Sequence, residues 1–278
     1  MAKQFGTKLN QLEQHLPEGV VVDAAWLTKL GYSTALRTQY VQAGWLEQPA
    51  YRVFRRPRGE LDWRQVVISL QTVLDYPLII GGRSALQMQA LTHYISSQAR
   101  ELHLYGPVSP PKWIDELNLD VAFRYHNSAR LFPDWAATRS STRKGRKVDQ
   151  AWAELADPEL DSLVTYEMGH WDWTLALSAP ERAILEMLDE LPNNESFHHL
   201  DMIMEGLTSL SPRRLQKLLE ACRSVKVKRL FFFFADRHAH AWLKRLDRKK
   251  IDLGTGNRML VKGGKLDPTY RITVPKEI

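Results

Sequence analysis

Apolar residues recur with helical spacing in the segment that precedes Gly31. They occupy Val21, Ala24, Ala25, Leu27 and Leu30. This spacing predicts a helix over Val20–Leu30. We expect Gly31 to end it, because glycine readily adopts the left-handed conformation that closes a helix.

A second helix is predicted directly after this turn. Ser33 and Thr34 can cap it by accepting hydrogen bonds from its first backbone amides. Its buried face would carry Leu36, Tyr40, Val41 and Ala43. Its opposite face would carry Thr34, Arg37, Thr38 and Gln42. These side chains are donors that can reach phosphates or base edges if the helix enters a major groove.

A basic hairpin is predicted to follow. Trp45–Glu47 and Tyr51–Phe54 alternate as two short strands around Pro49 and Ala50. They lead into Arg55, Arg56 and Arg58. Helix, turn, helix and basic hairpin form the outline of a winged helix-turn-helix, whose wing would lie along the DNA backbone. The alternative is an ordinary helix pair followed by an edge strand that charge protects from aggregation.

The next segment alternates between helical and extended patterns. Leu61–Tyr76 has helical apolar spacing, and Pro77 should end that helix. Leu78–Ile80 reads as a short strand, and Ser84–Tyr94 as a helix. The Gly81-Gly82 pair between them could bind phosphate at the helix start. We favour a tight turn, because neither a P-loop nor a dinucleotide fingerprint surrounds it.

Further strands follow in the middle of the chain. Glu101–Tyr105, Asp120–His126 and Leu163–Thr174 read as strands, and Pro110–Leu117 as a short helix. Together with the preceding elements they predict a small mixed sheet with helices packed on it.

The last part of the chain is predicted to be mainly helical. Helices are expected at Ala179–Leu191, at Ser196–Leu207 and after Ser211. Four consecutive phenylalanines in Val225–Ala235 fit a buried strand or a buried helix, and we favour a helix that continues, with a break, through Trp242 and Leu246. Arg258–Lys262 and Tyr270–Val274 alternate and predict a closing hairpin.

Charge is strongly segregated along the chain. Residues 1–58 have net charge +4, residues 59–212 have −10, and residues 213–278 have +12, within a total of +6. The basic C-terminal part could gain affinity for a polyanion by releasing counterions, or it could consist of solvated helix faces. The short run Arg139–Lys147 carries five further cations and reads as a loop.

Other features limit the class of protein. The chain is long enough for two domains. Cys222 is the one cysteine, so a disulfide within the chain is excluded, and a reducing compartment fits. We find no run of about 18 apolar residues and therefore expect a cytoplasmic protein with no membrane partner.

Catalytic patterns are scarce. Clusters of potential ligands occur at His198, His199 and Asp201, and at His238 and His240, but neither has a known zinc spacing. We predict no catalytic residue, no metal and no cofactor. Two alternatives stay open. The middle domain could sense a ligand, or Asp236, Asp247 and Asp252 could support a metal-dependent nuclease.

Three segments resemble AbiEi-type antitoxins. They are LGYSTALRTQYVQAGWLEQ in the helix pair, IIGGRSALQMQAL in the middle, and the tail from Val227 to Pro275. The resemblance covers nearly the full chain and implies an α+β protein. It also implies a winged helix-turn-helix at residues 1–58 and a larger mixed α/β antitoxin domain at residues 59–278, whose basic part is residues 213–278.

The resemblance also implies a function. Such antitoxins are encoded beside a nucleotidyltransferase-like toxin, and they repress their own operon by binding inverted repeats in its promoter. They belong to type IV systems and serve phage defence by abortive infection. We therefore expect double-stranded promoter DNA and the cognate toxin as partners, and a monomer in solution.

Carried over residue by residue, the resemblance and the charge pattern define two sets of side chains. The predicted DNA-binding set is Ser33, Thr34, Arg37, Thr38 and Gln39 on the recognition helix with Arg52, Arg55, Arg56 and Arg58 on the wing. The second basic surface, a backbone-binding or antitoxin surface, is Lys244, Arg245, Arg248, Lys249, Lys250, Arg258 and Lys262.

Overall fold

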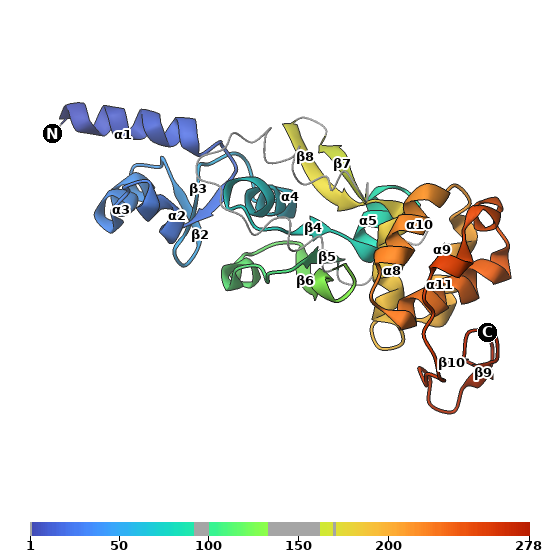
Figure 1. The fold of residues 1–278 in the computed structure, drawn as a ribbon. Coiled ribbons are helices and arrows are strands. Elements are labelled where there is room, and N and C mark those ends of the chain that lie inside the picture. The colour runs from blue at the N-terminus through green and yellow to red at the C-terminus, as the bar shows by residue number, and fades with distance from the viewer. Residues whose placement is uncertain (1, 92–99, 133–161, 169–170) are drawn as a thin grey trace.

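The computed structural model describes residues 2–91, 100–132, 162–168 and 171–278. The molecule is elongated (Figure 1). Residues 2–58, here named the winged region, lie at one end, a five-stranded sheet lies in the middle, and a group of helices lies at the other end. None of the described helices is long and apolar enough to cross a membrane. The predicted loop Arg139–Lys147 lies outside the described residues.

The winged region combines a helix pair with a small antiparallel sheet. Its described elements are α1 (Ala2–His15), β1 (Val21–Asp23), α2 (Ala24–Lys29), α3 (Thr34–Gln42), β2 (Glu47–Ala50) and β3 (Val53–Arg55). The sheet has the order β1-β3-β2. A helix, a turn, a second helix and a hairpin therefore follow one another in the order of a winged helix-turn-helix.

The first predicted helix was placed too early. Val21–Asp23 form strand β1, paired antiparallel with β3, and the helix begins only at Ala24. Consecutive valines favour a strand because their branched side chains lose freedom in a helix. Asp23 then starts α2 by accepting a hydrogen bond of 2.7 Å from the amide of Trp26.

The turn between the two helices was predicted correctly. Gly31 has a φ of +82°, in the left-handed region. The Ser33 hydroxyl caps α3 by accepting a hydrogen bond of 3.3 Å from the amide of Leu36. Ala43, expected on the buried face, is instead the exposed residue that ends α3.

The tip of the wing lies two residues later than predicted. Pro49 and Ala50 belong to β2, and Tyr51 and Arg52 form the turn. Arg52 adopts a left-handed conformation with φ +59°. Proline is tolerated in β2 because this strand is at the edge of the sheet, where its missing N–H need not pair.

The central sheet is mixed, as predicted. Its strands are β4 (Ile79–Ile80), β5 (Arg100–Gly106), β6 (Val121–Asn127), β7 (Leu163–Met168) and β8 (Trp171–Ser178). The order is β6-β5-β4-β8-β7, with β5–β6 and β4–β8 parallel and the other pairs antiparallel. The single strand expected over Leu163–Thr174 is in fact two antiparallel strands, β7 and β8.

Short helices accompany this sheet. They are α4 (Trp63–Ile68), its π-helical continuation (Ser69–Val73), α5 (Gly82–Met88) and the 3-10 helices Lys112–Glu116 and Ser128–Arg130. The helix predicted over Leu61–Tyr76 is therefore shorter at both ends. The helix expected over Ser84–Tyr94 starts two residues earlier, at Gly82, and ends at Met88, before its predicted end.

The C-terminal part is mainly helical. It contains α8 (Pro180–Glu190), α9 (Phe197–Gly206), α10 (Pro212–Ala221), α11 (Val225–His238) and the 3-10 helices Ala241–Arg245 and Arg248–Lys250. The phenylalanine run is thus helical, and Phe231, Phe232 and Phe234 have no exposed surface. The stretch from Val227 to Ala235 is buried throughout, and α11 lies among the other helices (Figure 1).

The closing hairpin pairs different residues from those predicted. Its strands are β9 (Lys265–Asp267) and β10 (Ile272–Val274). Arg258 instead makes an isolated parallel bridge to Ile272, so Arg258–Lys262 do not form the partner strand.

Two hydrophobic cores meet at the small sheet of the winged region. Val22 and Phe54 are directly paired and point into a small core with Leu12, Leu27 and Tyr40. Their neighbours Val21 and Val53 belong to the large core of the remaining chain. Alternate residues of a strand face opposite sides, so β1 and β3 serve both cores. The predicted domain boundary after residue 58 comes directly after this shared sheet and remains a prediction.

Candidate functional site

The face of α3 that points to solvent is uncharged. Its exposed side chains are Thr34, Ala35, Thr38, Gln39 and Gln42. At 100° per residue these five positions form one continuous stripe along the helix. The stripe offers hydroxyl groups, methyl groups and two amides.

Arg37, which we predicted to face DNA, is buried. Only 6% of the surface of Arg37 is exposed to solvent. The Nη1 group donates hydrogen bonds to the carbonyl oxygens of Ala24 (3.1 Å) and Tyr32 (2.9 Å) and to the hydroxyl of Thr28 (2.7 Å). The Nη2 group donates to the hydroxyl of Thr34 at 2.9 Å. The prediction was wrong because Arg37 lies on the side of α3 that packs on α2, where it joins the two helices.

Two of the predicted wing arginines also have internal partners. Arg55 is 5% exposed, and its guanidinium donates to Glu47 Oε2 and to the carbonyl of Gly59, both at 2.6 Å. Arg56 donates to the carbonyl of Leu16 at 3.2 Å and lies 3.3 Å from Glu18 Oε1. Both therefore brace the winged region instead of presenting charge to a ligand.

The exposed wing consists of other residues. Arg52 and Arg58 are exposed, as the prediction requires. Tyr51 at the tip is 77% exposed and Trp45 at the start of the wing is 49% exposed. Sequence reasoning had assigned both aromatics to strands. In the structure Trp45 precedes β2 and Tyr51 lies in the turn, so neither belongs to a strand.

The second basic surface is mostly exposed. Lys244, Arg245, Lys249, Lys250, Arg258 and Lys262 all face solvent. Arg248 is engaged, because it forms an ion pair with Asp236 and donates to the Tyr270 hydroxyl at 2.9 Å. Burial would raise the pKa of Asp236, but hydrogen bonds from Arg248 and Tyr270 outweigh it and hold the pKa below its usual value.

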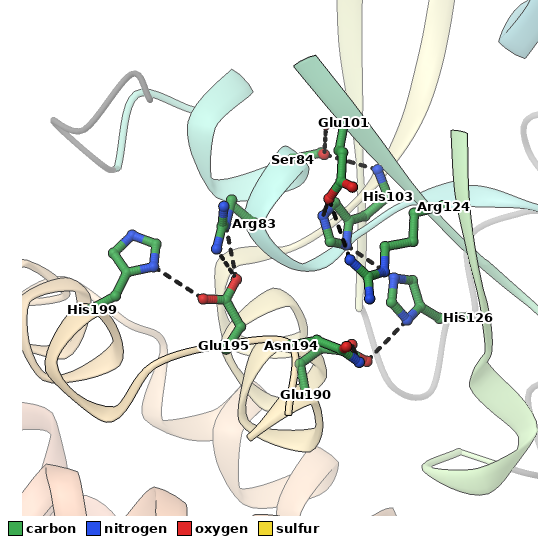
Figure 2. Close-up of polar contacts among 10 residues, drawn as sticks. All are labelled: Arg83, Ser84, Glu101, His103, Arg124, His126, Glu190, Asn194, Glu195 and His199. Carbon is green, nitrogen blue, oxygen red and sulfur yellow. Dashed lines mark hydrogen bonds and ion pairs between the residues drawn. The ribbon is translucent and has the colours of Figure 1, made fainter. Parts of the chain in front are cut away.

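A polar cluster lies between the central sheet and the C-terminal helices (Figure 2). Its members come from α5, β5, β6, α8 and α9 and the segment between those two helices: Arg83, His103, Arg124, His126, Glu190, Glu195 and His199. No local pattern indicates this cluster, because its members extend along the chain from Arg83 to His199.

Two histidines and a glutamate form a chain of hydrogen bonds in this cluster. His103 Nδ1 lies 2.9 Å from His126 Nε2, and His126 Nδ1 lies 2.9 Å from Glu190 Oε1. Burial, and the neighbouring His126, lower the pKa of His103 to about 4. Burial alone would raise the pKa of Glu190, but the hydrogen bond from His126 outweighs it, and the net shift is downwards.

An ion pair joins the start of α5 to the C-terminal helices. Arg83 Nε donates to Glu195 Oε1 at 2.8 Å, and Glu195 Oε2 lies 3.1 Å from His199 Nδ1. Gly82 has a φ of +50°, and its amide donates to Glu186 Oε2 at 2.8 Å. The Gly81-Gly82 pair is thus a tight turn whose amide is satisfied by a buried carboxylate.

The candidate metal ligands of the sequence have other partners. Asp201 accepts hydrogen bonds from Arg237 and lies 2.8 Å from His238 Nε2. His199 contacts Glu195, and His240 contacts the carbonyl of Met204. In the part of the chain that the structure describes, no group of three or more His, Cys, Asp or Glu side chains is arranged to hold a metal ion.

Known proteins were compared with this chain by sequence and by fold. A comparison with curated proteins finds no match. A solved structure, "Crystal structure of RV2827C protein from Mycobacterium tuberculosis", is similar with a TM-score of 0.52 and 17% sequence identity. The similarity covers 95% of this chain and 88% of that chain, and at this identity it shows the fold alone.

Two family models together cover nearly the whole chain. The model described as "Transcriptional regulator, AbiEi antitoxin N-terminal domain" matches residues 6–97. The model described as "Transcriptional regulator, AbiEi antitoxin, Type IV TA system" matches residues 99–275. The chain therefore belongs to the AbiEi antitoxins, a family of transcriptional regulators of type IV toxin–antitoxin systems.

Proposed function

We propose that this antitoxin represses its own operon by binding inverted repeats in the promoter through the winged region. The observation that supports this most is the exposed, uncharged stripe of α3 beside a wing that projects Tyr51 and Arg52. A second helix of this kind fits a major groove, and a wing of this kind contacts the neighbouring backbone. The proposed site of action is the cytoplasm, and no enzymatic step is part of the proposal.

Inverted repeats would recruit more than one chain. Each half-site is read by one recognition helix, so a two-fold related pair of sites needs two winged regions. We propose that the protein is a monomer in solution and that two copies meet on DNA.

We further propose that the C-terminal part counteracts a nucleotidyltransferase-like toxin, either directly or through a shared target. The second basic surface belongs to the end of the molecule opposite the winged region (Figure 1). A substitution there should therefore separate toxin neutralisation from promoter binding. Growth of cells that express the toxin, with and without each variant, measures neutralisation.

The first experiment is a gel-shift titration against the upstream promoter region and a scrambled duplex at two salt concentrations. Selective binding to the promoter that weakens with salt would support autoregulation. Equal affinity for both duplexes would contradict it, because a sequence-specific regulator must discriminate.

A second candidate function rests on a pocket beside the winged region. Trp26, Lys29 and Asp75 line a cavity of about 290 Å³ together with Tyr76. A ligand there would touch both α2 and the segment after α4, so it could adjust how the winged region sits. Thermal stabilisation by one member of a metabolite panel, lost in Trp26→Ala, would favour a ligand-sensing regulator. A panel without effect would argue against it.

A further inference from the structure

The exposed face of α3 offers fewer kinds of side chain for contacting bases than the sequence indicates. The sequence offers Arg37 as a donor on this helix, and arginine is the usual partner of guanine, whose O6 and N7 atoms both accept hydrogen bonds. In the structure the Arg37 guanidinium makes four hydrogen bonds inside the winged region. No charged side chain remains on the exposed stripe of α3.

The groups that do remain suit a different base pair. Gln39 and Gln42 carry amides, which can both donate to N7 and accept from the N6 amino group of adenine. Ala35 and Thr38 carry methyl groups, which pack against the C5-methyl of thymine. Adenine and thymine therefore find complementary groups on this stripe, whereas guanine finds no cation.

We propose that α3 reads A·T base pairs in the major groove, with Gln39 and Gln42 on adenine and Ala35 and Thr38 on thymine methyl groups. The inference rests on the proposed function, because it assumes that the winged region binds promoter DNA. It adds the expected base composition of each half-site, which membership of the family does not specify.

The distribution of cations supports the same division of roles. The exposed cations of the winged region include Lys29 at the end of α2, Arg52 in the turn between β2 and β3, and Arg58 after β3, all outside α3. Lysine and arginine side chains commonly contact phosphates, and phosphate contacts position a protein without reading sequence. Specificity is then carried by neutral side chains, and the salt dependence by the surrounding cations.

The test is selection of bound sequences from a pool of random duplexes, followed by affinity measurement on the selected site. We expect paired half-sites rich in A·T. Replacing a single contacted A·T pair by G·C should weaken binding about tenfold, the discrimination that one good bidentate contact supplies. Half-sites dominated by G·C pairs would overturn the inference while leaving DNA binding intact. A pool with no enriched sequence would instead overturn the proposed function.

A variant with altered base preference tests which side chain of α3 contacts which base pair. Gln39→Arg should shift the preferred base pair at one position from A·T to G·C, because arginine pairs with guanine. The matched control is Gln87→Arg, since Gln87 is also exposed on a helix but belongs to α5, outside the winged region. Circular dichroism checks that both variants fold. An unchanged preference in folded Gln39→Arg and in the second variant, Gln42→Arg, would contradict the assignment.

Discussion

In the winged region, Arg37 and Arg55 are almost completely buried, whereas Lys244, Lys249 and Lys250 in the second basic surface are exposed. The two regions look alike in the sequence, since both are rich in cations. They differ because Arg37 and Arg55 bind backbone carbonyls or a carboxylate within or next to the winged region. Charge counted along a sequence is therefore not the charge that a ligand meets.

The C-terminal part has one arginine of the first kind. Arg229 is 2% exposed, and it donates to the carbonyls of Leu253 and Gly256, both at 2.7 Å. Like Arg37, it uses its planar group of donors to bind more than one backbone carbonyl inside the protein. Both regions therefore contain buried arginines, and substitutions can measure how buried and exposed cations differ in their effect on stability.

The largest expected effect is that of Arg37→Ala on stability. Removal of the guanidinium leaves its acceptors without their donor in a buried site, at a cost of about 3 kcal/mol of unfolding free energy. Urea denaturation measures this. The matched control is Arg52→Ala, which removes an exposed arginine. Equal stability of Arg37→Ala and Arg52→Ala would show that the buried arginine does not hold the helix pair.

The second largest expected effect is the pH dependence of stability that results from the buried His103 in the polar cluster. The pKa of His103 is lowered to about 4, from an ordinary value of 6.5. Between these two pH values the unfolded chain binds a proton that the folded chain does not, so stability falls as pH falls. We expect a loss of about 2 kcal/mol between pH 7 and pH 5.

Urea denaturation at a series of pH values checks this, and His103→Gln should show a flatter pH profile than the wild type. The lowered pKa values of Glu190 and Glu195 act in the same direction only at lower pH, below about 4.5. A profile for His103→Gln that matches the wild type between pH 5 and pH 7 would exclude His103 as the origin.

The smallest effect concerns the exposed cations. Arg52→Ala and Lys249→Ala should leave stability almost unchanged. Arg52→Ala should reduce the salt dependence of DNA binding by about one phosphate equivalent if the wing contacts the backbone. Lys249→Ala should do the same if the second basic surface also contacts DNA. Fluorescence anisotropy across a salt series measures the slope, and an unchanged slope for either variant removes that surface from the DNA contact.

Local signals in the sequence determined much of the fold. Ser33 and Gly31 fixed the turn between α2 and α3, because a cap and a left-handed turn depend on neighbouring residues only. The mixed central sheet and the C-terminal helices followed from apolar periodicity. The family was also readable from the sequence alone.

The tertiary structure decided which side of each element meets water. Val21 joined a strand because β3 was available to pair with it, and Arg37 turned inwards because the carbonyls of Ala24 and Tyr32 lay within its reach. His103, His126 and Glu190 came together only when the sheet packed on α8. Contacts between residues far apart in the chain leave no local pattern, so the sequence could name the elements of the winged region but not the side chains that they expose.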